Sequence, residues 1–373
     1  MKREMFLGAV SALAMSAVVP AFAQSKDKED ERIRLRYEYE LKLAQPIPRS
    51  QRAPRAPKPP EQEGPEHVVR EVKTINVGPT GELQLSNMAG DINVTGSSGR
   101  DVKIEIIKRT RNKDEEEAKR HLELVDVQVI EGAGRAEVRT VYPRVEYARD
   151  RRRGVNVSVD YNVTMPMGAR VTVKSMSGNV QVRNTKGEVR AESMSGGVKV
   201  ESAQRLFLAK SVSGDVELLS AMGDTELNAE SMSGRVIGRG VKARTLDLSS
   251  ISGDVVLNDV VCERANIRSI SGSLDYAGQI AKSGRIELKS HSGNVRLLLL
   301  NPSGFELDAN SFTGNIRSDL PIILRGLMKS GQDPDKAPKR GLGIGRKIQG
   351  VHGDGSVLVE ITTFSGDIVI TKK

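Results

Sequence analysis

Aromatic residues are scarce in this sequence and tryptophan is absent. Phe, Trp and Tyr make up 3% of the 373 residues, so a core of any size must be built from Val, Leu, Ile and Ala. The single cysteine, Cys262, excludes an internal disulfide, and we interpret it as a small buried apolar residue. The fold must therefore be held by its core alone.

Motifs for catalysis are also missing. The histidines at 67, 121, 291 and 352 lack the spacing of metal ligands, and no Gly-x-Ser-x-Gly elbow occurs. The Gly-x-Gly-x-Gly run at 341–345 has no strand–turn–helix context, so it is weak evidence for a phosphate site. We predict that the protein is not an enzyme, and we expect neither a metal nor a cofactor.

Long hydrophobic runs are absent outside the N-terminus. Lys2 and Arg3 precede an apolar stretch over 5–20, and the small-x-small sequence at 21–23 predicts a signal peptide over residues 1–23. The stretch is too short to cross a bilayer, and no later run approaches ~20 apolar residues. We expect an exported protein, periplasmic or at the cell surface, with no transmembrane segment after signal removal.

Two regions of different character follow the leader. Residues 24–70 are rich in proline and charge, which predicts a disordered tether. Residues 71–168 predict a strand-rich region, with strands at 101–107, 125–130 and 155–163. The charged stretch 112–124 has the acidic run 114–117 near its start, which suits a helix N-terminus, so it predicts one helix outside the strands.

Residues 169–373 carry an internal repeat, Ser-x-Ser-Gly or a close variant. Neighbouring repeat glycines are 18 to 21 residues apart, except for a last gap of 52, and a looser copy surrounds Gly90. The structural repeat glycines are Gly178, Gly196, Gly214, Gly234, Gly253, Gly272, Gly293, Gly314 and Gly366.

Three columns of the aligned repeat are apolar throughout: seven and five residues before the glycine, and two after it. Residues two apart in a strand share a face, so each copy is a strand, a glycine turn and a second strand. Stacking buries the apolar faces of neighbouring copies. The sequence therefore predicts an all-β fold, a right-handed β-solenoid of ~19-residue two-strand coils preceded by the strand-rich N-terminal region.

Serines stand three and one residues before the glycine, as at Ser175 and Ser177. Both positions share the parity of the buried valines. We therefore predict serine ladders at the corner, with hydroxyls bonded to the backbone or to the next coil.

The column two residues before the glycine has the opposite parity. If the strand stays straight, its side chains form an apolar stripe on the outside, which would mark an interface. If the chain bends at the serines, they pack inside or under the first region, and we favour this packed arrangement. The column holds Met176, Met194, Val212, Met232, Ile251, Ile270, His291, Phe312 and Phe364.

These repeats, the Val163–Pro166 entry and the closing Thr363–Ile368 segment resemble the bacterial putative-adhesin domain family. The resemblance covers about residues 72–373. It implies an exported or membrane-tethered β-solenoid, and it provides no catalytic motif to carry over onto this chain.

Asp or Asn follows the glycine in seven of the ten copies. A calcium-binding solenoid needs carboxylates that converge from adjacent coils, and Gly197, Arg235 and Ser273 interrupt this column. Because Asp and Asn suit turns and cap their own backbone, we interpret the column without a metal.

Basic residues concentrate in an insertion at about 320–353, which we predict to be an irregular loop. Its segment 325–347 has seven Lys or Arg and two Asp, a net +5. Such a cluster favours anionic partners, whereas aromatic residues barely interleave it, so nucleic acid is not expected. The candidate binding residues are Arg325, Lys329, Lys336, Lys339, Arg340, Arg346 and Lys347, with a second run at Arg149, Arg151, Arg152 and Arg153.

The functional hypothesis is a non-catalytic, exported envelope or cell-surface scaffold that contacts an anionic envelope polymer or a partner protein. Two alternatives stay open: a self-assembling structural solenoid, and a polysaccharide-acting enzyme built on a β-helix. The sequence does not identify the ligand or the oligomeric state.

Overall fold

The computed structural model describes residues 64–143, 155–300, 304–324 and 346–372, which form an all-β body with a single helix within these ranges. The all-β fold class is thereby confirmed. The predicted signal peptide, nearly all of the predicted tether and most of both basic runs lie outside the described residues.

Antiparallel strands build the N-terminal region. β1 pairs with β4 and β4 with β7, while β5 and β6 form a separate antiparallel pair. Their bounds are β1 Glu66–Asn76, β4 Asp101–Arg111, β5 Asp126–Gly132, β6 Arg135–Val141 and β7 Val157–Pro166. β1 takes in the last residues assigned to the tether, because it pairs with β4 from Glu66 onward.

The predicted helix is present as α2, Glu115–Leu124. The Asp114 side chain caps it by accepting hydrogen bonds from the backbone N–H groups of Glu116 and Glu117. The helix buries Ala118 and Leu122 and leaves its charged face outside.

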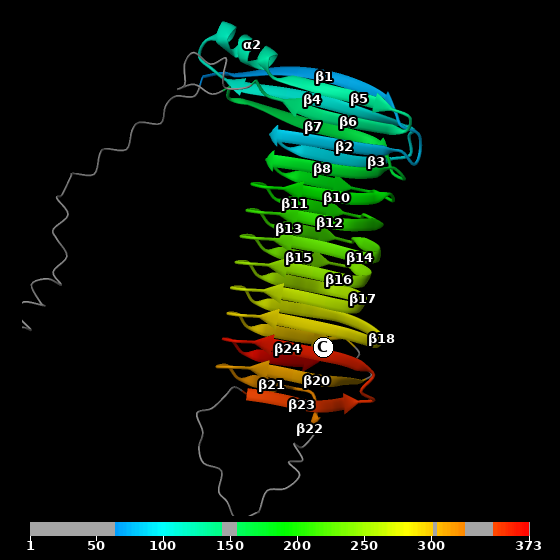
Figure 1. The fold of residues 1–373 in the computed structure, drawn as a ribbon, viewed down its shortest axis with the longest axis vertical. Helices are drawn as coiled ribbons and strands as arrows, with labels where there is room; N and C mark the ends of the chain where they lie inside the picture. Colours follow the sequence, from blue (N-terminus) through cyan, green and yellow to red (C-terminus); the bar gives the residue numbers. More distant parts are fainter. Residues whose placement is uncertain (1–63, 144–154, 301–303, 325–345, 373) are drawn as a thin grey trace, which may run out of the picture. The chain divides into compact units, whose positions relative to one another are not determined.

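Ten repeat copies stack as two columns of parallel strands (Figure 1). The strands before the glycine are β2 Glu82–Ala89, β8 Arg170–Ser177, β10 Glu188–Ser193, β12 Arg205–Ser211, β14 Met222–Ser231, β16 Lys242–Ser250, the later parts of β17 Val255–Ser269 and β18 Leu274–Ser290, β24 Val357–Thr363 and β20 Gly304–Ser311. Those after it are β3 Ile92–Ser97, β9 Val180–Arg183, β11 Val198–Glu201, β13 Val216–Leu219, β15 Val236–Arg239, the first parts of β17 and β18, β19 Val295–Leu299, β25 Ile368–Lys372 and β21 Ile316–Ser318.

The register places equivalent repeat positions directly over one another. Val171 pairs with Val189, Ala191 with Ala209 and Leu246 with Ala265. These side chains are buried, as the apolar columns predict, and they form one continuous core with the N-terminal region.

The stacking order departs from the order of the sequence at the C-terminal end. β24 pairs with β18 on one side and with β20 on the other, so that Ile361 lies between Leu288 and Ala309. The last copy in sequence therefore sits between the copies of Gly293 and Gly314, as the red strand between yellow and orange in Figure 1. The inserted strand β24 is hydrogen-bonded along both of its edges. The copy of Gly314, which comes earlier in the sequence, therefore ends the stack.

The insertion predicted to be irregular is partly a strand, so that prediction is wrong for its end. β23, Arg346–Gly353, pairs antiparallel with β20, and β22, Ile323–Leu324, pairs with β23. β23 covers an edge of β20 that would otherwise lack a partner. Residues 325–345 lie outside the described residues.

In the seven copies from Gly196 to Gly314, the serine three residues before the glycine is buried and bridges two coils. Thr363 does the same before Gly366, whereas the buried Ser175 hydroxyl has no hydrogen-bond partner among the described residues. The Ser250 hydroxyl donates to the carbonyl of Gly234 at 3.0 Å and accepts from the N–H of Gly253 at 2.9 Å. The serine one residue before the glycine, such as Ser252, is exposed. The predicted ladder is thus confirmed for the first serine and wrong for the second, because the turn ends the strand's alternation.

Glycine at the corner is required by close approach between coils. A Cβ on Gly196 or Gly253 would press against the carbonyl of the repeat glycine in the preceding coil. The hydroxyl bridge and the missing Cβ therefore serve the same contact.

Six of the seven Asp and Asn residues after the glycine accept a hydrogen bond from the backbone of the next coil. The seventh, Asn315, lies in the copy that ends the stack. Oδ1 of Asn179 accepts from the N–H of Gly197 at 2.9 Å, and Oδ1 of Asp254 accepts from the N–H of Ser273 at 2.8 Å. The interpretation as self-capping turn residues is therefore corrected: these side chains are rungs between coils.

Replacing Ser250 with Ala should lower the free energy of unfolding by about 1–3 kcal/mol, because it removes both corner hydrogen bonds in a buried site. The matched change Ser252→Ala, two residues on but exposed, should stay within about 0.5 kcal/mol. Denaturant unfolding measures both. Equal losses would show that the hydroxyl bridge does not stabilise the corner.

Cysteine pairs can test the stacking order. Lys289 lies beside Thr362, and Thr362 beside Asn310, all on the outer face. Oxidised Lys289→Cys/Thr362→Cys and Asn310→Cys/Thr362→Cys should crosslink, because neighbouring strands bring Cα atoms within disulfide range. Lys289→Cys/Asn310→Cys should not. Crosslinking of Lys289→Cys/Asn310→Cys, together with no crosslink of Lys289→Cys/Thr362→Cys, would mean that the copies stack in sequence order.

Candidate functional site

The column two residues before each glycine is exposed along the stack. Met176 is 51% exposed, Met194 52% and Phe312 47%. The favoured packed arrangement is therefore wrong. We call the whole column the outer stripe; in stacking order it holds Met88, Met176, Met194, Val212, Met232, Ile251, Ile270, His291, Phe364 and Phe312.

Strand geometry explains this exposure. β8 stays extended through Ser177, so Met176 points away from the core that Ser175 faces. The chain turns only after this point, which places one large side chain per coil on the outside. The sequence signal for this exposure is that the column two residues before the glycine alternates with the buried columns of the same strand.

The backbone along the outer stripe is already paired. The N–H of Met194 donates to the carbonyl of Ser175 at 3.0 Å, and the carbonyl of Met194 accepts from Ser213 at the same distance. A partner at the stripe therefore meets side chains and finds no free strand edge there.

Three aromatic rings stack at the C-terminal end of the stripe. The ring centroids of His291 and Phe364 are 5.0 Å apart, and those of Phe364 and Phe312 are 4.7 Å apart, with interplanar angles of 12° and 8°. The inserted last copy supplies the middle ring, so the altered stacking order builds this part of the stripe.

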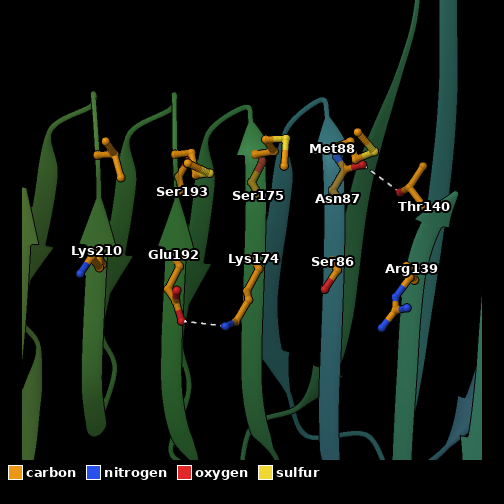
Figure 2. A pocket seen from close by; sticks show the side chains of 13 residues that line it. Ser86, Asn87, Met88, Arg139, Thr140, Lys174, Ser175, Glu192, Ser193 and Lys210 are labelled. Atoms are coloured by element: carbon orange, nitrogen blue, oxygen red, sulfur yellow. Dashed lines mark hydrogen bonds and ion pairs between the residues drawn. The ribbon is translucent and has the colours of Figure 1, made fainter. Parts of the chain in front are cut away.

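Beside the stripe runs a row of mostly polar and charged residues, four positions before each glycine. Figure 2 shows Lys174, Glu192 and Lys210 of this row on consecutive strands, further from the turns than the corner serines. Lys174 Nζ lies 3.3 Å from Glu192, and Lys210 Nζ lies 2.7 Å from Glu230. The hydrogen bond with Glu230 raises the pKa of Lys210, which keeps it charged.

A hollow of about 440 Å³ lies between this row and the N-terminal half of the stripe. We call it the Met hollow, because Met88, Met176 and Met194 form its apolar wall. Its charged lining residues are Arg139, Lys174, Lys210 and Glu192. Methionine side chains are flexible and polarisable, which suits a wall that adapts to its ligand.

A second hollow, of about 760 Å³, lies beside the C-terminal half of the stripe. Ile251, Ile270 and Phe364 contribute to its wall, and we call it the Ile/Phe hollow. Its charged lining residues are all cationic: Arg268, Lys289 and Lys347. The carboxylate of Glu287 lies nearby, and its pKa is lowered mainly by the hydrogen bond from Lys289.

A third hollow, of about 790 Å³, lies elsewhere on the coils and is more polar than the other two. Two of its four lining cations are paired, with Arg205 2.7 Å from Asp224 and Arg244 3.8 Å from Glu263. Cys262 reaches it but is buried, and burial raises the pKa of its thiol, as expected for a structural cysteine.

Of the predicted basic site, only two residues lie in the described part of the chain. On β23, Lys347 Nζ lies 3.3 Å from Asp308 and lines the Ile/Phe hollow, while Arg346 hydrogen-bonds the side chain of Asn315. Arg325, Lys329, Lys336, Lys339, Arg340, Arg149, Arg151, Arg152 and Arg153 lie outside it.

Within the described residues, no three His, Cys, Asp or Glu side chains gather as a metal site, and no helix is long and apolar enough to span a membrane. His291 belongs to the ring stack, and Nδ1 of His352 lies 2.7 Å from the carbonyl of Pro321.

A family model described as Toastrack DUF4097 matches residues 80–371. The chain belongs to this family. This match confirms the resemblance to the putative-adhesin domain family. No protein with curated annotation matches the chain in sequence.

Three solved structures resemble the chain at 11–13% sequence identity. A putative adhesin from Bacteroides fragilis NCTC 9343 is 11% identical, with 82% of this chain and 97% of that chain covered and a TM-score of 0.37. A putative adhesin from Parabacteroides merdae ATCC 43184 is 13% identical, with 62% and 89% covered and a TM-score of 0.39. A putative lipid binding protein from Parabacteroides distasonis ATCC 8503 is 12% identical, with 82% and 96% covered and a TM-score of 0.35.

The ring stack gives a graded prediction. Phe364 stacks on two rings and Phe312 on one, so Phe364→Leu should lower the free energy of unfolding by about 1–3 kcal/mol and Phe312→Leu by about half as much. Thermal or denaturant unfolding measures both. Phe312→Leu costing more than Phe364→Leu would contradict the position of the inserted copy.

Proposed function

We propose that this protein is a non-catalytic, exported binding scaffold of the cell envelope or cell surface, which holds its partner along the outer stripe. The proposal includes a right-handed solenoid with ~19-residue coils of two strands, supported by the 18- to 21-residue spacing of the repeat glycines. The single observation that carries the proposed function is one exposed apolar side chain per coil on most of the ten stacked copies.

A row of this kind is costly to expose without a use. Soluble monomers rarely leave large contiguous apolar patches in water, and those that exist commonly mark interaction sites. Here eight large apolar side chains of the outer stripe are between 41% and 52% exposed. The corner needs a buried serine, but it does not require Met, Ile or Phe at the next position.

Positive charge beside the stripe favours an anionic partner. The two hollows together are lined by six Lys or Arg and one Glu, since the Met hollow has three cations and the Ile/Phe hollow another three. All of these cations except Arg268 also pair with a neighbouring carboxylate. The basic run 325–347 ends at Lys347, inside the Ile/Phe hollow. We propose that this run and the run at 149–153 add attraction to anionic envelope polymers or an acidic partner protein.

Capping at both ends of the described stack disfavours a self-assembling fibre. β1, β4 and β5 are antiparallel strands at one end, and β22 and β23 are antiparallel at the other. A polymer that continued the solenoid would need an open parallel edge at each end.

Retention on isolated envelope tests the proposal. Met176→Gln/Met194→Gln should reduce retention several-fold without unfolding the protein, because both side chains are exposed. Neutralising Lys336, Lys339, Arg340, Arg346 and Lys347 together should reduce it mainly at low salt, because screening shortens to about 8 Å at physiological ionic strength.

The matched control is Ile130→Gln, which changes a 59% exposed residue away from the stripe. It should be retained like wild type. Full retention of the Met176→Gln/Met194→Gln variant would exclude the outer stripe as the binding surface. Full retention of the neutralised variant would show that the basic run has no part in binding.

A further inference from the structure

The Ile/Phe hollow has the features of a site for a hydrocarbon chain. Its wall is formed by apolar side chains of the outer stripe, including Ile251, Ile270, Phe312 and Phe364, and its volume is about 760 Å³. That volume lies within the range of about 300–1,000 Å³ found for small-molecule sites. The hollow crosses five stacked coils, so a ligand in it would lie along the stack.

The floor of the hollow has no hydroxyl to spare. Ser250, Ser269 and Ser290 donate to glycine carbonyls of the preceding coil at 3.0, 3.2 and 3.0 Å. Thr363 donates to the carbonyl of Gly293 at 3.0 Å. Each of these floor hydroxyls already serves the corner ladder.

The backbone beside the hollow is equally committed. The N–H groups of Ile251, Ile270, His291 and Phe364 donate to corner carbonyls of the preceding coil at 3.2 to 3.3 Å. A ligand polar group above the floor and the stripe backbone would lose water without gaining a partner there. Hydrogen-bonding side chains are instead offered by the neighbouring row, at Ser249, Asn310 and Thr362. The floor and wall therefore favour hydrocarbon over a peptide, whose backbone needs hydrogen bonds.

The rim selects the charge of the ligand. Arg268, Lys289 and Lys347 line the hollow, while the nearby carboxylates of Glu287 and Asp308 pair with the two lysines and lie outside its lining. Three cations against two carboxylates leave one positive charge in excess. A head group with a single negative charge balances it.

From these features we propose that the Ile/Phe hollow binds a monomeric, singly charged anionic amphiphile, such as a long-chain carboxylate. Its chain lies along Ile251, Ile270 and the ring stack, and its head lies by Arg268 and Lys289. The inference rests on the proposed function, since it names the ligand class of the same stripe.

Two other occupants fit the charges less well. A second copy of the chain would bring the same cations face to face. An anionic bilayer would also meet the column that follows the repeat glycines, which contributes the carboxylates of Asp254 and Asp367 on the coils of this hollow. A single amphiphile contacts only the cationic side.

Calorimetric titration of the purified protein with monomeric laurate tests the proposal. Ile251→Gln/Ile270→Gln should weaken the affinity about tenfold or more, because the chain loses its apolar wall. Arg268→Gln/Lys289→Gln should weaken laurate binding up to about fivefold, yet leave binding of uncharged dodecanol unchanged. Dodecyltrimethylammonium should bind more weakly than laurate.

Matched controls keep exposure and pairing constant. Ile130→Gln/Val261→Gln changes exposed apolar residues away from both hollows, and Lys199→Gln/Arg296→Gln removes cations that also face carboxylates. Both should bind laurate like wild type. Equal affinity in the hollow variants and these controls would overturn the proposal, as would preference for the cationic amphiphile.

Two further measurements identify the competing occupants. Sedimentation with phosphatidylglycerol vesicles, without binding of free laurate, would assign the stripe to a bilayer surface and overturn the proposal. A dimer in light scattering that Ile251→Gln/Ile270→Gln dissociates would assign it to a second copy. If laurate binding fails while envelope retention still depends on the stripe, the ligand class is wrong and the binding scaffold stands.

Discussion

The corner hydroxyl that bridges two coils is the interaction on which the rest of the structure depends. At Ser250 a single buried oxygen donates to the glycine carbonyl of the coil before and accepts from the glycine N–H of its own coil. This geometry requires the two glycines to lie directly over one another, where a Cβ would clash. Register, coil alignment and the tight corner follow from one short motif.

The same motif determines which side chains face outward. The buried serine determines which side chains of the strand face the core. The next residue must then point away from the core as long as the strand remains extended. Repetition then places a side chain in the same position on every coil, about 4.8 Å apart. An extended surface of this kind needs no loop to build it, and its chemistry can change coil by coil from methionine to aromatic rings.

Much of the fold could be predicted from local sequence pattern. The apolar columns, the glycine corner, the inward serine and the helix after Asp114 each reflect a rule that acts within a few residues. The sequence also shows that Asp or Asn follows the glycine in seven of ten copies. It does not show that these side chains bond to the next coil, because Asp and Asn also commonly cap their own turn.

The errors arose where local pattern does not determine the outcome. Nothing near Phe364 specifies which coil its copy stacks on. The 52-residue gap before Gly366 shows that the chain leaves the regular repeat, but it does not show where the chain rejoins the stack. The sequence allows both an exposed Met176 and a bend at the serines that would bury it, and only the register of β8 through Ser177 decides between them. Lys347 was identified for its charge, whereas its place beside the ring stack depends on β23 pairing with β20.

Oxidation of the methionines by hydrogen peroxide, followed by mass spectrometry, tests the central claim most directly, because it reports the exposure of thioethers without changing the sequence. Met88, Met176, Met194 and Met232 should oxidise readily, while Met165, which is fully buried, should not. Adding isolated envelope should protect the four stripe residues but leave Met222, 40% exposed and off the stripe, unprotected. Slow oxidation of the stripe methionines in the free protein, or equal protection of Met222, would contradict the account.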